Sequence, residues 1–163
     1  MVEQLDRNLA HFADIVERDL NVSIRDLPGS GAAGGLGGGL VAFAAGRLER
    51  GVNLVIEAVN LHKRLLSADL CLTGEGALDS QSAFGKTVVG VARLAHSMGC
   101  ATLALAGSIG PGAEAVLEQG VDAYFSICPR PISMNEAVGR AALLLENATE
   151  QAVRAFLAGR KTH

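Results

Sequence analysis

Apolar side chains recur at every third or fourth position over residues 1–20, with charged side chains between them. This spacing is typical of an amphipathic helix that needs a surface to lie on. Residues 51–66 repeat the pattern, and another helix is expected to begin once the glycine-rich residues 29–39 end. No strand in the first 66 residues is indicated more strongly than Val22 to Ile24. The apolar positions that indicate these three helices are, in order, Val2, Leu5, Leu9, Phe12 and Val16; Leu36, Leu40, Phe43 and Ala44; and Leu54, Ala58, Leu61 and Leu65.

From Ala68 onward the pattern changes to short apolar runs that alternate with helical spacing. Alternation of this kind predicts parallel strands joined by crossover helices. The expected fold class is therefore α/β, with three layers in the order α/β/α. Three strands make a small sheet for about five helices, which predicts that the chain is part of a larger protein. The expected strands are 68–73, 101–106 and 122–127, and the expected helices are 84–98, 112–119 and 133–158.

The last of these helices carries signals at both ends. Ser133 is placed to cap its first turn, and Glu136 three residues later completes a capping box. Gly159 is expected to end the helix, because glycine readily adopts the left-handed conformation that follows many helices.

Composition narrows the classes of function. The formal net charge is −3, and the chain lacks the clustered basic face that a nucleic-acid partner normally needs. No apolar run approaches the roughly 18 residues of a membrane span, and the chain opens on Glu3, Asp6 and Arg7 rather than on a leader. The three cysteines, Cys71, Cys100 and Cys128, lie in or directly beside predicted strands without metal-ligand spacing, so we interpret them as small buried side chains in a reducing compartment. The sequence predicts a cytoplasmic protein that binds neither nucleic acid nor membranes.

The segment from Leu72 to Thr87 concentrates acids, glycines and a lysine on the connection between a strand and a helix. Glu75 and Asp79 could hold Mg²⁺ or accept a proton from a substrate hydroxyl. A nearby anion would explain why Lys86 stands at a helix start. Acids at a helix entry are also ordinary caps, and a lysine can simply reach solvent, so these alternatives stay open. A Walker phosphate loop is not expected, because Ser80 stands where its first glycine belongs and the loop is too long.

A second glycine cluster, Gly29-x-Gly31-x-x-Gly34, has the letters of the dinucleotide-binding fingerprint. That motif should follow a strong strand directly, and here Asp26 and Pro28 interrupt the approach. Two other interpretations remain. The glycines either let a helix pack closely on its neighbour, or they form a backbone cradle for a carboxylate or phosphate, with Ser30 supplying a hydroxyl.

Other polar positions are less informative. Gly107 to Gly110 follows the second strand and either completes the wall of a crevice or forms only a turn. His11, His62 and His96 fall on predicted helices far from these loops in sequence. Neither a metal cluster nor a nucleophile-histidine-acid triad can be assembled from them, so hydrolase and zinc-site functions are not expected.

Four runs of the sequence, taken in order, resemble the bacterial glycerate kinase family of type 1. They are Pro28 to Gly39, Ala68 to Lys86, Ala104 to Gly107 and Phe125 to Pro129. The match extends from about residue 1 to residue 158. Its specific part is Thr-Gly-Glu-Gly-x-Leu-Asp-x-Gln-Ser-x-x-Gly-Lys, which ends at Lys86.

The resemblance implies ATP-dependent phosphorylation of D-glycerate, giving 2-phosphoglycerate in many members, by an enzyme of two α/β domains. ATP and Mg²⁺ are the implied cofactors, and glycerate is the small-molecule substrate. Phosphoryl transfer depends mainly on positioning and on offsetting charge, which suits these residue types. The implied roles are Gly74, Gly76, Gly85 and Lys86 toward the nucleotide phosphates, Glu75 and Asp79 toward Mg²⁺ or the substrate hydroxyl, Glu75, Asp79 and Lys86 as catalytic groups, and Gly29, Ser30, Gly31 and Ser108 toward glycerate or nucleotide.

One departure from the family is large. Full members are much longer and begin with a segment carrying Asp-Ser-Phe-Lys-Gly, which nothing in this chain matches. The chain resembles a C-terminal portion of the fold, with 1–67 as a mainly helical part of one domain and 68–163 as the part with the acid-glycine segment. Two classes of function remain: a kinase or its catalytic piece, and a non-catalytic α/β module that binds phosphate or nucleotide. A second copy of the chain or a complementing N-terminal half is the expected protein partner.

Overall fold

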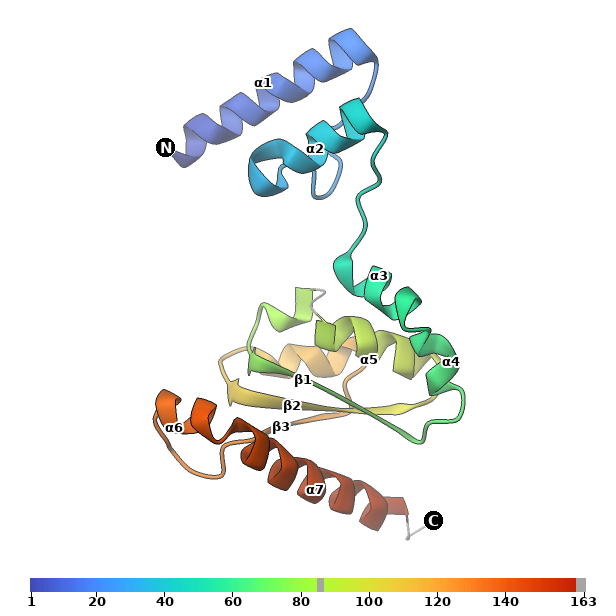
Figure 1. Ribbon diagram of the computed structural model, residues 1–163, viewed down its shortest axis with the longest axis vertical. Helices are drawn as coiled ribbons and strands as arrows, with labels where there is room; N and C mark the ends of the chain where they lie inside the picture. The colour runs from blue at the N-terminus through green and yellow to red at the C-terminus, as the bar shows by residue number, and fades with distance from the viewer. Residues whose placement is uncertain (85–86, 161–163) are drawn as a thin grey trace. The chain divides into compact units, whose positions relative to one another are not determined.

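The computed structural model describes residues 1–84 and 87–160, which divide into two compact units, Met1–Arg50 and Gly51–His163. Unit 1 contains helices α1 (Val2–Leu20) and α2 (Ala32–Ala44). Unit 2 contains the sheet and the remaining helices (Figure 1). The sequence-based division into family domains at residue 67 stays a prediction.

In unit 1 the amphipathic helix over the first twenty residues is confirmed. One face of α1 is buried in a small apolar cluster with the chain that follows it, made of Ala13, Val16 and Ile24. Val22 to Ile24 is not a strand. α2 spans Ala32–Ala44, but Ala33, Gly34 and Gly35 have left-handed φ values, so its continuous part begins at Leu36. The expected helix is therefore present, and it begins within the glycine-rich residues rather than after them.

Unit 2 is built on a parallel sheet of order β1-β2-β3, with β1 at Leu70–Leu78, β2 at Ala101–Ile109 and β3 at Ala123–Ser126 (Figure 1). The expected alternation of strands and helices is therefore confirmed. The helical elements of this unit are α3 (Gly51–Ala58), α4 (Leu61–Leu65), η1 (Ser82–Phe84), α5 (Thr87–Ser97), η2 (Ala113–Gln119), α6 (Met134–Gly139) and α7 (Ala141–Arg160), of which η1 and η2 are 3-10 helices. Across the described ranges of both units, no helix combines the length and the apolar character that crossing a bilayer requires.

The first strand differs from its expected bounds in a way that affects the site. β1 was predicted to end at Thr73, whereas its pairing with β2 continues to Leu78. Glycine is disfavoured in strands, so the local sequence indicated an end where main-chain pairing with β2 in fact persists. Glu75 therefore lies on a strand, opposite Ala106, rather than on a loop.

Two expected helices are divided in the structure. The helix predicted at 51–66 breaks at Asn60, whose φ of 50° is left-handed, and the helix predicted at 133–158 breaks at Arg140. Gly159 was expected to stop the last helix, but α7 continues through it to Arg160. A helical spacing of apolar residues does not reveal such breaks, because the residues on either side keep the same periodicity.

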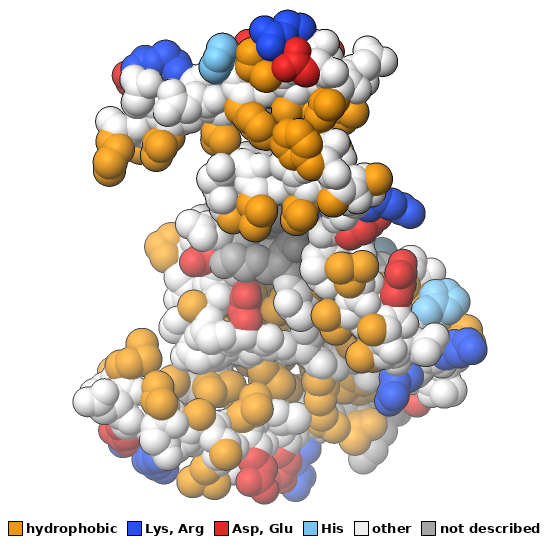
Figure 2. All heavy atoms as spheres, turned by 45° about the horizontal axis from the view of Figure 1, so that its top comes forward, with side chains coloured by type: hydrophobic (Ala, Val, Ile, Leu, Met, Phe, Trp, Pro, Cys, Tyr) orange, Lys and Arg blue, Asp and Glu red, His pale blue; other side chains and the backbone are white. Residues whose placement is uncertain are grey.

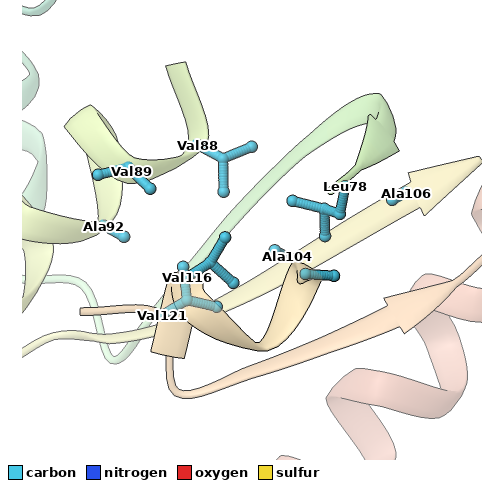
Figure 3. Close-up of a cluster of buried hydrophobic side chains, with 9 residues drawn as sticks. Leu78, Val88, Val89, Ala92, Ala104, Ala106, Val116 and Val121 are labelled. Carbon is cyan, nitrogen blue, oxygen red and sulfur yellow. The ribbon is translucent and has the colours of Figure 1, made fainter. Parts of the chain in front are cut away.

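The core lies between the sheet and α5 with η2 (Figure 3). Its side chains are almost completely buried, and α7 covers the opposite face of the sheet (Figure 1). The three-layer α/β/α expectation is thus confirmed for unit 2. The cluster consists of Leu78, Val88, Val89, Ala92, Ala104, Ala106, Ala113, Val116 and Val121.

The capping signal at Ser133 is confirmed, since its hydroxyl accepts a hydrogen bond from the Glu136 backbone N–H at 3.2 Å. We expect Ser133→Ala to lower the free energy of unfolding by about 1 kcal/mol, because a helix N–H then loses its acceptor. Urea denaturation followed by circular dichroism measures this change. The exposed Ser67 provides the control, and a Ser133→Ala loss no larger than that of Ser67→Ala would contradict the cap.

Candidate functional site

The loops that follow β1 and β2 are joined by backbone hydrogen bonds at the carboxyl edge of the sheet. Gly110 N–H donates to Leu78 O at 2.7 Å, and Ser80 N–H donates to Pro111 O at 3.1 Å. Ligands of open α/β sheets bind beyond this edge, where helix N-termini also offer free N–H groups. The segment after β2 therefore helps to build the wall of the candidate site.

The Glu75 side chain is the most unusual group at this edge. It shares a face of the sheet with its register partner Ala106, which belongs to the cluster under α5. Its Oε1 atom is buried and has no hydrogen-bond partner among residues 1–84 and 87–160. A buried carboxylate without a partner is costly, so an oxygen in this position suits a cation or a proton donor supplied by a ligand.

Asp79 lies directly after β1 and performs a structural task. Its Oδ1 accepts a hydrogen bond from Gln81 N–H at 2.8 Å, while its own N–H donates to the hydroxyl of the buried Ser82 at 3.2 Å. The capping alternative left open by the sequence is therefore present in the structure. One carboxylate oxygen serves the turn, which leaves Oδ2 as the oxygen for a ligand.

The two glycines of the Thr-Gly-Glu-Gly motif have different surroundings. A Cβ atom at Gly74 would lie 2.4 Å from Leu105 O, whereas a Cβ at Gly76 would meet nothing within 4 Å. A Cβ at Gly107 would lie 2.6 Å from Gly76 O. Gly74 and Gly107 thus allow β1 and β2 to approach closely, and Gly76 leaves open space that a ligand can reach.

A cavity of about 1020 Å³ opens between the sheet and the last two helices, and Ser108 is an exposed residue on its wall. Arg130, which the sequence analysis missed, also lines it and is held by Glu136 Oε1 at 2.7 Å. The sequence signal that could have identified Arg130 is a positively charged residue between two prolines just after a strand end. The rest of the lining is mostly apolar: Leu72, Leu105, Ile109, Ile127, Ile132, Met134, Ala137, Val138 and Leu145 are among its residues.

Gly29, Ser30 and Gly31 belong to unit 1, where they pack tightly. Ser30 O accepts a hydrogen bond from Gly38 N–H at 2.8 Å, and a Cβ at Gly37 would lie 2.6 Å from Gly29 O. These contacts show the backbone before α2 packing closely against the first part of that helix. Ser30 and Gly31 also line a pocket of about 270 Å³ in this unit, so the substrate-binding role stays a prediction.

The structure thus brings together only part of the predicted site. Glu75, Asp79 and Ser108 lie at the carboxyl edge in unit 2, and the glycines of residues 29–31 lie in unit 1. Gly85 and Lys86, which were expected to contact phosphate, lie outside the described residues.

The thiols are free, and burial raises the pKa of both Cys71 and Cys100 above the ordinary 9.0. Because the pKa of these thiols is higher in the native state than in the unfolded chain, their protonated form stabilises the fold below pH 9. This stabilisation is lost as pH rises through the native pKa. We therefore expect the unfolding free energy to fall above pH 9, and a Cys71→Ala, Cys100→Ala double variant to lose that part of the fall. Denaturation at pH 8 and pH 10 tests this, and an identical fall in both proteins would contradict it.

The structure defines an α/β protein with a parallel sheet and a cavity lined by residues near the carboxyl ends of its strands. The chain matches the model of the Glycerate kinase family over residues 1–157. Because this match covers nearly the whole chain, the protein belongs to the glycerate kinase family.

Individual relatives agree with the family match. The chain is 48% identical over 147 residues to a glycerate kinase of Halalkalibacterium halodurans, covering 90% of this chain and 39% of the relative. It is 39% identical to the glycerate 2-kinase of Escherichia coli K12, covering 84% and 36%. The crystal structure of a Salmonella typhimurium LT2 protein assigned as glycerate kinase 2 matches 100% of this chain and 41% of that chain, at a TM-score of 0.71 and 35% identity. The chain therefore spans about two fifths of the length of these relatives.

Proposed function

We propose that this chain is the part of a glycerate kinase that transfers a phosphoryl group from ATP to a hydroxyl of D-glycerate, giving 2-phosphoglycerate. The observation that carries the proposal is the Oε1 atom of Glu75, which is buried without a hydrogen-bond partner among the described residues and lies inside the motif that is specific to the family. Family membership adds the reaction class.

The residues present fit a magnesium-nucleotide ligand. Within the described part of the chain, Oε1 of Glu75 has no hydrogen-bond partner, and Oδ2 of Asp79 lies outside the turn contact made by Oδ1. Hard cations prefer such oxygen donors. Magnesium usually takes one or two carboxylates, with water and phosphate oxygens completing its shell, so a larger acidic cluster is not required. The chemistry that a bound Mg²⁺ supplies is neutralisation of charge on the phosphates.

The roles proposed for the other residues of unit 2 are supported by the space around those residues. Gly76 leaves room for a phosphate to approach the backbone, and Gly74 holds β1 and β2 together beneath it. Glu75 or Asp79 accepts the proton of the attacking hydroxyl, and Ser108 orients glycerate from the cavity wall. Gly85 and Lys86 are proposed to contact the phosphates, and Gly29, Ser30 and Gly31 to hold the substrate.

We also propose that the protein is cytoplasmic. The thiols of Cys71 and Cys100 are free and buried, as expected in a reducing compartment.

The alternative of a non-catalytic binding module is favoured by one observation, the limited share of each relative that the chain covers. Incubation with D-glycerate, ATP and Mg²⁺, followed by phosphorus NMR, distinguishes the two. A phosphoglycerate signal together with ADP supports the kinase and identifies the phosphorylated hydroxyl. Absence of product from the chain both alone and with the rest of the family fold would remove the proposal.

A further inference from the structure

Ser82 carries a hydroxyl that the folded chain buries completely. Its side chain is 0% exposed, and Thr102 is the other buried polar side chain among the residues whose burial the structure describes. Burial of a hydroxyl is costly unless hydrogen bonds replace those that it made to water. An alanine would fill most of the same volume at a lower cost, so the hydroxyl of Ser82 indicates a local task.

The hydroxyl of Ser82 bridges two backbone groups at the end of β1. It accepts a hydrogen bond from Asp79 N–H at 3.2 Å and donates to Ala77 O at 3.5 Å. The backbone N–H of Ser82 also donates to Asp79 O at 3.0 Å. Ser82 therefore holds the backbone of Asp79 at both its N–H and its carbonyl, at the point where the strand becomes a turn.

The carboxylate of Asp79 is directed by the same turn. Its Oδ1 accepts a hydrogen bond from Gln81 N–H at 2.8 Å, which limits rotation of the side chain. The loop after β2 lies against the other side, since Gly110 N–H donates to Leu78 O at 2.7 Å and a Cβ at Gly110 would lie 3.5 Å from Asp79 Cβ. A side chain held at its backbone and at one oxygen presents its second oxygen, Oδ2, over a restricted range of directions.

The apolar surface of unit 2 does not supply this restraint. Figure 2 shows hydrophobic side chains gathered over the lower part of the unit, where the last two helices lie. Within the described part of the chain, positions 77–82 do not line the cavity on that side. Hydrogen bonds in the turn itself, rather than contact with that surface, therefore hold the Asp79 carboxylate.

We propose that Ser82 is a positioning residue, which acts through Asp79 by holding its carboxylate in the direction that a metal-nucleotide ligand requires. The inference rests on the proposed function, in which Asp79 supplies an oxygen to that ligand. Donor atoms that are ordered before binding bind more tightly, because less freedom is lost when the ligand arrives. Ser82 itself is kept from the ligand, since its hydroxyl is buried and both of its hydrogen bonds are made within the chain.

Hydrogen exchange tests the contact in the chain without ligand. In Ser82→Ala the Asp79 N–H loses its acceptor, so its exchange, followed by NMR, should become at least about tenfold faster. Thr102→Val removes the other fully buried hydroxyl and should leave the exchange of the Asp79 amide within about twofold. Equal exchange of this amide in Ser82→Ala and in the unaltered chain would overturn the proposal.

A double-mutant cycle separates positioning from a general loss of structure. The probe is Mn²⁺ with ADP, and its binding is measured through the relaxation rate of water protons. Ser82→Ala is expected to weaken binding about fivefold to tenfold, and Asp79→Asn at least about tenfold. In the Asp79→Asn background, Ser82→Ala should change binding by less than about twofold, because the carboxylate that Ser82 holds is already gone. The control Thr102→Val should bind Mn²⁺ with ADP as the unaltered chain does.

Additive losses in the double variant would make Ser82 a general structural residue and overturn the proposal. Unchanged binding in Ser82→Ala or in Asp79→Asn, or no binding of Mn²⁺ with ADP by the folded chain, would do the same. Circular dichroism confirms that each variant is folded. Ser82→Cys, which keeps the shape but offers a weaker acceptor, repeats the test if Ser82→Ala does not fold, and loss of the fold in both variants would also overturn the proposal.

The positioning role and the kinase activity can fail separately. If the cycle gives the expected result but no phosphoglycerate forms, the role of Ser82 stands and the kinase proposal is removed. If phosphoglycerate forms while Ser82→Ala binds Mn²⁺ with ADP normally, the kinase proposal stands and the role of Ser82 is removed.

Discussion

Glu75→Gln is expected to reduce turnover by about 10²- to 10³-fold in whichever form of the protein yields phosphoglycerate, either the chain alone or its complex with the rest of the fold. The reason is that the Oε1 atom of Glu75 is buried without a hydrogen-bond partner among the described residues, so its charge is available to the reacting groups. Glutamine keeps the shape and removes the charge. Steady-state kinetics with saturating ATP and glycerate measure the loss.

The stability of the same variant separates a functional role from a structural one. A carboxylate that serves the ligand contributes little to the empty fold, so Glu75→Gln should leave the free energy of unfolding unchanged or raise it by about 1 kcal/mol. Glu114, an exposed acid in the first turn of η2, provides the control through Glu114→Gln. Full turnover in Glu75→Gln, or a loss of stability with the loss of turnover, would count against the proposed role. Binding of Mn²⁺ and ADP, measured through the relaxation rate of water protons, gives a readout that does not depend on turnover.

Gly74→Ala is expected to destabilise the protein by about 1–3 kcal/mol, while Gly76→Ala should change stability by less than about 0.5 kcal/mol. A methyl group at Gly74 would lie 2.4 Å from Leu105 O, which forces β1 and β2 apart, whereas the same group at Gly76 has no neighbour within 4 Å. Thermal unfolding of the two variants measures the difference. The pair is well matched, because both glycines lie on β1 within one motif.

Kinetics of the Gly76 variant test the ligand role that this open space suggests. If a phosphate approaches the backbone there, Gly76→Ala should raise the KM for ATP about tenfold with the fold intact. Equal stability losses in the Gly74 and Gly76 variants would show that the strand geometry does not distinguish them. An unchanged KM would remove Gly76 from the phosphate site.

Much of the fold of unit 2 follows from local patterns in the sequence. The alternation of apolar runs and helical spacing predicts the parallel strands and the three layers, and the N-cap at Ser133 marks the start of α6. These features depend on residues close together in the chain. The Asn60 and Arg140 breaks were not predicted, because a helical period continues through a single left-handed or irregular residue.

The sequence by itself determined the α/β class, the family motif and the residue types of the site, since these depend on the order of side chains along the chain. Only the tertiary structure decided that Glu75 lies on a strand, with a buried oxygen that has no partner among residues 1–84 and 87–160, and that Gly74 and Gly76 have different surroundings. It also showed the cavity between the sheet and the last two helices. The physical reason is that burial, strand pairing and close approach depend on β2 and α7, whose residues are distant from β1 in sequence and meet it only in the folded chain.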